Sequence, residues 1–156
     1  MWKKINGKWV VIKGDTGWRK IESSNLASGY VLVRRTSENA FITADGGKYN
    51  TVKIASNATV ESDQMGESGQ NRQRITLVKI PTGWGSKTTV AGQVVTHDGY
   101  DILGNAVVTA VNDQNGLQIR NYTGNKTQNQ LLRFPMITYP TTVEWPTSLP
   151  GTAVDY

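Results

Sequence analysis

Cysteine is absent from this chain of 156 residues. A disulfide framework and a thiolate metal site are therefore excluded, and packing alone must hold the fold. No segment approaches the roughly 18 consecutive apolar residues that a membrane-spanning helix needs. The opening residues 1–5, MWKKI, also lack the apolar core of a secretion signal. We therefore expect neither membrane insertion nor export through a signal of the chain's own.

Acidic residues are scarce only at the start of the chain. Overall, 17 Lys and Arg stand against 12 Asp and Glu, which gives a formal net charge of +5. Residues 1–20 hold six basic residues and one acidic residue, whereas eleven of each follow from residue 21 onward. Nucleic-acid affinity depends on neutralising phosphates with Lys and Arg, so the neutral main body argues against such a partner. The charge change favours two parts, a connector over residues 1–20 and a head domain over 21–156.

Helical periodicity is also missing, apart from one possible turn of helix at 129–132. Short apolar segments instead alternate with Gly, Asn, Asp and Pro turns, which is typical of an all-β protein. Asn6-Gly7 is the dipeptide best suited to a two-residue hairpin turn. The strands that we predict are 2–5, 8–13, 18–21, 30–35, 39–43, 49–54, 74–80, 90–97, 106–111 and 117–122. Their spacing beyond residue 20 indicates a β-sandwich or jelly-roll head behind a short N-terminal hairpin.

Two segments of the head suggest how it is covered. The strand 30–35 is apolar on both alternating faces, which predicts cover on both sides, either in a sandwich or at a subunit interface. The tail 135–150 carries four prolines, which lack backbone donors and are barred from central strands. We expect this tail to wrap along the surface or along a neighbouring subunit, with Trp145 as its anchor.

The turn at 97–101 gathers the single histidine, two carboxylates and an aromatic ring at a strand end. Asp98 and Asp101 can accept hydrogen bonds from sugar hydroxyls, and Tyr100 can pack against the apolar face of a pyranose ring. His97 completes this candidate saccharide contact. The alternative is a plain Asp-Gly turn with an incidental histidine. A calcium site that adds Asn105 is a weaker interpretation, and we predict no metal or cofactor.

Three further residues are candidate contacts. Trp84 lies between two glycines, and its ring is either a stacking platform for a sugar, a trimer contact, or a core aromatic that closes a loop. Arg120, near Tyr122 at a strand end, has a guanidinium that can bridge ring hydroxyls or a phosphodiester. The alternative for Arg120 is an ordinary surface ion pair.

The order of several short motifs carries a resemblance to a known family. The motifs are GDTGWR at 14–19, PTGW at 81–84, THDG at 96–99, NGLQIR at 115–120, LRFP at 132–135 and WPTSLPG at 145–151. Together they resemble the C-terminal region of tail-fibre or receptor-binding proteins of phages that infect Gram-positive bacteria. The resemblance implies a homotrimeric adhesion domain at the tail tip of a virion, in contact with other tail or baseplate proteins. It also implies binding, without catalysis or cofactor, of a host cell-wall or cell-surface saccharide through Trp84, His97, Asp98, Tyr100, Asp101, Arg120 and Tyr122.

Two other classes of function remain open. A polysaccharide depolymerase needs a carboxylate pair at a defined separation, and nothing in the sequence selects a pair from its acidic residues. A cell-wall-binding module of a bacterial surface enzyme or adhesin is the second, because residues 2–9, WKKINGKW, are similar to aromatic wall-binding repeats. That segment occurs once, whereas such modules are built from several copies.

Overall fold

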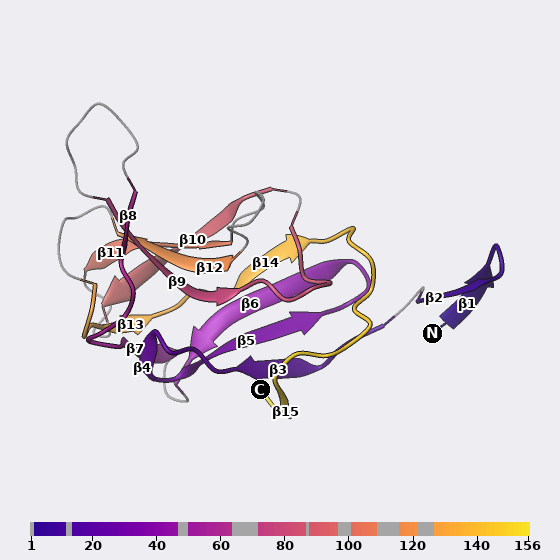
Figure 1. Ribbon diagram of the computed structural model, residues 1–156, viewed down its shortest axis with the longest axis horizontal. Helices are drawn as coiled ribbons and strands as arrows, with labels where there is room; N and C mark the ends of the chain where they lie inside the picture. Colours follow the sequence, from indigo (N-terminus) through magenta and orange to yellow (C-terminus); the bar gives the residue numbers. More distant parts are fainter. Residues whose placement is uncertain are drawn as a thin grey trace.

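The computed structural model describes residues 2–11, 14–46, 50–63, 72–86, 88–96, 101–108, 116–121 and 127–156. These residues form strands, turns and loops (Figure 1). They include no helix, and hence none that is long and apolar enough to cross a membrane. The predicted all-β class is confirmed.

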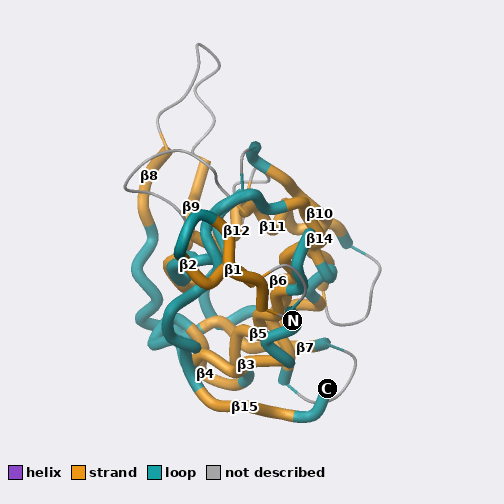
Figure 2. Tube along the Cα trace, turned by 90° about the vertical axis from the view of Figure 1, so that its right-hand side faces the viewer, coloured by secondary structure: helices purple, strands orange, loops and turns teal. Residues whose placement is uncertain are grey.

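The chain begins with a separate hairpin of β1 (Trp2–Ile5) and β2 (Lys8–Val11). Its turn residues Asn6 and Gly7 have φ angles of 47° and 79°. Two positive φ angles are what a type I′ hairpin turn requires, which is why Asn-Gly specifies it. The hairpin stands clear of both larger sheets in Figure 1, and Figure 2 shows it from the side that it occupies.

The smaller of the two main sheets has five antiparallel strands in the order β14-β6-β5-β3-β15. Its strands are β3 (Trp18–Ile21), β5 (Tyr30–Arg35), β6 (Asn39–Asp45), β14 (Ile137–Pro140) and β15 (Thr152–Val154). Because β3 belongs to this sheet, the head begins before the boundary that the charge pattern suggested at residue 20. Pro140 ends an edge strand, as the missing backbone donor of proline requires.

The larger sheet has eight antiparallel strands in the order β4-β7-β13-β10-β11-β12-β9-β8. Its strands are β4 (Leu26–Ser28), β7 (Thr51–Ile54), β8 (Glu61–Asp63), β9 (Arg72–Lys79), β10 (Val90–Thr96), β11 (Ile102–Val108), β12 (Gly116–Asn121) and β13 (Leu131–Arg133). The helical turn predicted at 129–132 is wrong. Leu131–Arg133 instead forms a strand inside the sheet, between β7 and β10, and buries Leu132 completely.

The core lies between the two sheets. Buried side chains from both layers form one apolar cluster, which includes Val31, Val33, Ile42, Val94, Ile119 and Leu132. Leu32, on the opposite face of β5 from Val31 and Val33, is also fully buried. The predicted cover on both faces of this strand is therefore confirmed within a single chain. The second sheet of the sandwich covers the face with Val31 and Val33, and the trimer stays a proposal.

Candidate functional site

One predicted contact, Asp101, lies at one end of the eight-stranded sheet. β10 ends and β11 begins there, and the pairing of Gly104 with Asn121 places the end of β12 at the same level. Asp101 is exposed immediately before β11. Its N–H donates to the Thr96 hydroxyl at 3.3 Å, and its carbonyl accepts from the Thr96 N–H at 2.9 Å. His97, Asp98, Tyr100 and Tyr122 lie outside the described residues. We call this place the sheet end.

Arg120 lies on the outer face of the same sheet, farther from its end. It pairs in register with Asn105, four residues along the strand from Asp101, a separation of about 13 Å at roughly 3.3 Å per residue. Its guanidinium donates to the Gln118 side-chain oxygen at 3.2 and 3.3 Å, and the Gln118 amide donates to Thr76 at 3.3 Å. Among the described residues, Arg120 is held by an amide rather than by the carboxylate of a surface ion pair.

Trp84 lies at the other end of the sheet, and its predicted role as a stacking platform is wrong. The ring is 0% exposed and belongs to the core cluster, so no sugar or second subunit reaches it. It leaves a tight turn in which the Trp84 N–H donates to the Pro81 carbonyl at 3.0 Å, with Gly83 at φ 93°. A positive φ at the third turn position favours glycine, as in a type II turn. The core-aromatic alternative is confirmed.

The turn that carries Trp84 is bound to other elements through three consecutive carbonyls. Arg35 donates to the Gly83 carbonyl, the Tyr139 hydroxyl donates to the Trp84 carbonyl at 2.8 Å, and the Thr141 hydroxyl donates to that of Gly85 at 2.6 Å. Burial raises the pKa of Tyr139, an effect that the nearby charge of Arg35 partly offsets. Tyr139 therefore acts as a neutral donor.

Arg35 joins this turn to the C-terminal tail. The side chain is 3% exposed, and it also donates to the Val143 carbonyl at 2.6 Å and to the Glu144 carbonyl at 2.7 Å. Its guanidinium lies 5.1 Å from the centre of the Trp145 ring, within cation–π range. Sequence reasoning missed Arg35, because a charged residue in an apolar strand gives no sign of partners about a hundred positions away.

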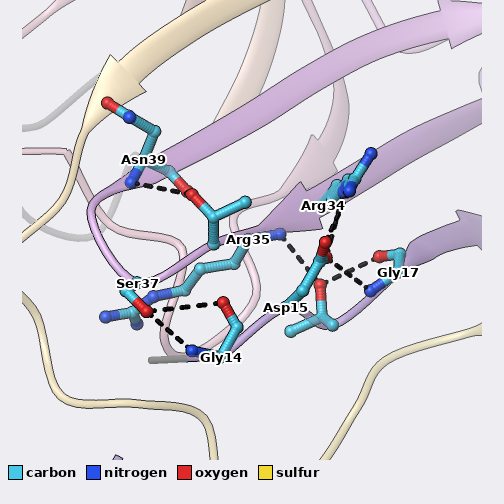
Figure 3. Close-up of polar contacts among 9 residues, drawn as sticks. Gly14, Asp15, Gly17, Arg34, Arg35, Ser37 and Asn39 are labelled. Atoms are coloured by element: carbon cyan, nitrogen blue, oxygen red, sulfur yellow. Dashed lines mark hydrogen bonds and ion pairs between the residues drawn. The ribbon is translucent and has the colours of Figure 1, made fainter. Parts of the chain in front are cut away.

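The root of the hairpin is fixed to the edge of the same region (Figure 3). The Gly14 N–H donates to the Ser37 hydroxyl at 2.6 Å, and the Arg34 guanidinium binds the Asp15 carboxylate through two nitrogens. Asp15 also accepts from the Gly17 N–H at 2.9 Å. These bonds secure the chain where it leaves the hairpin for β3.

The ion pair of Asp15 with Arg34 predicts a small pH dependence of stability. Hydrogen bonding to Arg34 lowers the pKa of the Asp15 carboxyl, burial opposes this, and the hydrogen bond from Gly17 and the charge of Arg34 add to the lowering. A lowered folded-state pKa contributes stability that is complete above the unfolded value near 4 and is lost as the pH falls through the folded value. Because both side chains are more than a third exposed, the contribution is below about 1 kcal/mol. Urea unfolding of Asp15→Asn and the parent should differ at pH 6 and converge toward pH 2.

A matched control for this titration is Glu22→Gln. Glu22 forms an ion pair with Lys20 but is 75% exposed, so we expect its removal to change stability by less than about 0.5 kcal/mol at any pH. A pH-independent difference between Asp15→Asn and the parent would contradict the role assigned to the carboxylate.

A hollow of about 810 Å³ lies between the hairpin and the tail. The hairpin lines one side, and the tail together with the β5–β6 region lines the other. The lining residues are Trp2, Lys8, Trp9, Arg35, Ser37, Thr141, Thr142, Val143, Glu144, Trp145, Pro146 and Thr147. Three of the five tryptophans of the chain therefore line one hollow, although Trp145 is more than a hundred residues from the other two.

Metal-ligand geometry does not appear in the described part of the chain, which contains no group of three or more His, Asp or Glu side chains placed to hold an ion. No family model, curated protein or solved structure shows a significant match to this chain. Support for a function therefore comes from the sequence resemblance and from the geometry of the sheet end and the hollow.

Proposed function

We propose that this chain is a receptor-binding domain of a phage tail, which recognises a cell-wall or cell-surface saccharide of a Gram-positive host. One observation carries the proposal: the strands that flank His97, Asp98, Tyr100, Asp101 and Tyr122 end together at one end of a packed eight-stranded sheet. A rigid sheet that presents polar and aromatic loop residues at one end suits binding of a ligand without a large loss of conformational entropy.

The rest of the proposal follows from the resemblance. The domain acts as a homotrimer at the tail tip, in contact with other tail or baseplate proteins, and binds the saccharide without cleaving it. Closed symmetry places three copies of the site side by side, so that modest affinities multiply into strong adhesion.

The test is binding of fluorescently labelled protein to a panel of Gram-positive cells, before and after the wall polysaccharide is stripped. We expect staining that is lost on stripping, and no release of reducing ends from purified wall. Asp101→Ala and Arg120→Gln should each weaken staining about tenfold, the effect of losing a hydrogen bond to a charged group. Lys79→Gln, at the other end of β9, is the control and should leave staining unchanged. Staining that survives stripping would refute the saccharide proposal.

A wall-binding module of a bacterial surface protein is a second candidate, and one observation favours it. The two tryptophans of the similar segment are exposed, Trp2 by 61% and Trp9 by 68%, as a wall-binding hairpin requires. Light scattering separates the candidates, because the phage proposal requires a trimer, whereas a monomer that stains cells supports the module.

A further inference from the structure

The hairpin presents an uncovered pair of aromatic rings. Lys4 pairs with Trp9 across the two strands, so Trp2, Lys4 and Trp9 share one face, with the two tryptophans diagonal to each other. Both rings line the hollow, yet both are more than half exposed. A two-stranded hairpin by itself is at best marginally stable in water, so these rings gain from contact with an occupant of the hollow.

The opposite wall offers hydrogen-bonding groups. Thr142, Glu144 and Thr147 are exposed, and no described residue forms a hydrogen bond or ion pair with their side chains. The hydroxyls of Ser37 and Thr141, which also line the hollow, already bind backbone groups. The free groups are thus two hydroxyls and one carboxylate.

The tail wall is held in place before any ligand arrives. Arg35 contacts Val143, Glu144 and Trp145 of the tail, and the ion pair of Asp15 with Arg34 fixes the chain that follows the hairpin. A wall that is formed in advance avoids part of the entropic cost of ordering on binding. The volume of about 810 Å³ also falls in the range of roughly 300–1,000 Å³ that is typical of small-ligand sites.

A pyranose unit has the chemistry that fits these walls. Its axial C–H groups form an apolar face that packs on an indole ring, and its rim of hydroxyls both donates and accepts hydrogen bonds. Glu144 accepts from hydroxyls, and Thr142 and Thr147 both donate and accept. The rings and the polar groups lie on facing walls, so one sugar contacts both.

We infer that this hollow is a second saccharide-binding site, formed by Trp2 and Trp9 of the hairpin and by Thr142, Glu144 and Thr147 of the tail. The inference rests on the proposed function for its class of ligand. The added site lies beside the hairpin of β1 and β2, which is at the far side of the molecule from β13, the strand that pairs with the end of β10 (Figure 1). Two separated sites on one chain allow a single copy to hold two positions of a wall glycan, which raises its avidity.

The test uses the side-chain N–H signals of the five tryptophans in the NMR spectrum of the full chain. The added ligand is the mixture of oligosaccharides released by mild acid from the walls of cells that the protein stains. We expect the signals of Trp2 and Trp9 to shift on titration, while those of Trp84, which is buried, and Trp18, which packs on Phe41 and Tyr156, stay in place. Trp9→Ala should raise the dissociation constant about tenfold, as loss of one stacked ring implies.

Matched variants separate this site from the sheet end. Trp18→Phe should leave the dissociation constant unchanged, and Asp101→Ala should leave the shifts of Trp2 and Trp9 unchanged. The second site would be overturned if the oligosaccharide binds the parent without shifting the signals of Trp2 and Trp9, and if this binding is lost in Asp101→Ala. The proposed function would then stand. If the signals of Trp2 and Trp9 shift, and Asp101→Ala stains cells as strongly as the parent, the hollow is kept as a saccharide site. The sheet end is then refuted as one. Hairpin signals that move on dilution alone would overturn the inference by showing that a second copy fills the hollow.

Discussion

Arg35→Met should lower the free energy of unfolding by about 3–5 kcal/mol, the scale expected when a buried network of hydrogen bonds to a charged group is broken. The substitution keeps the length of the side chain and removes its donors. The carbonyls of Gly83, Val143 and Glu144 then lose their partner together. Urea unfolding followed by far-UV circular dichroism measures the change, and the tail should become more sensitive to proteolysis at the same time.

Arg34→Met is the matched control, since it changes the neighbouring residue in the same strand. Arg34 pairs with Asp15 at the surface, and its side chain is 36% exposed, so its loss should cost less than about 1 kcal/mol. Arg35→Lys should fall between the two, because an ammonium keeps the charge but cannot reproduce a planar fork that spans several carbonyls. Equal losses for Arg34→Met and Arg35→Met would show that Arg35 is not the link between the turn and the tail.

Local chemistry made much of the fold predictable. Asn6-Gly7 specified the hairpin turn, and the apolar alternation of residues 30–35 specified a strand covered on both faces. By contrast, β13 has only three residues, too few to show a period, and its place between β7 and β10 depends on pairing across large sequence separations. Tertiary contacts of this kind leave no mark in a short window of sequence.

The site was predictable only in part, for the same reason. A strand end with Asp, Tyr and His side chains is visible as a turn motif, and the register of β10, β11 and β12 confirms only that the flanking strands end together. The hollow combines Trp2 and Trp9 with Trp145, which lie more than a hundred residues apart in the chain. Trp84 shows the converse case: a glycine on each side suggested exposure, whereas the turn directs the ring into the core.

Trp84→Ala should destabilise the protein by about 3–5 kcal/mol, the usual cost of deleting a fully buried aromatic side chain. The ring lies in the cluster that both sheets share, so its removal leaves a cavity that the surrounding strands cannot easily fill. Trp84→Phe keeps part of the ring volume and should lose less. Thermal unfolding followed by circular dichroism at a common protein concentration compares the three proteins.

Trp2→Ala provides the contrast that separates packing from recognition. Its side chain is 61% exposed, so the substitution should change stability by less than about 0.5 kcal/mol while weakening binding of wall oligosaccharide. Trp84→Phe should show the reverse pattern, with lower stability and an unchanged dissociation constant for the folded fraction. Because the two tryptophans differ in burial and not in residue type, opposite responses identify which ring supports the sandwich and which one meets the ligand. A Trp84→Phe protein that is as stable as the parent but no longer binds would return Trp84 to the recognition surface.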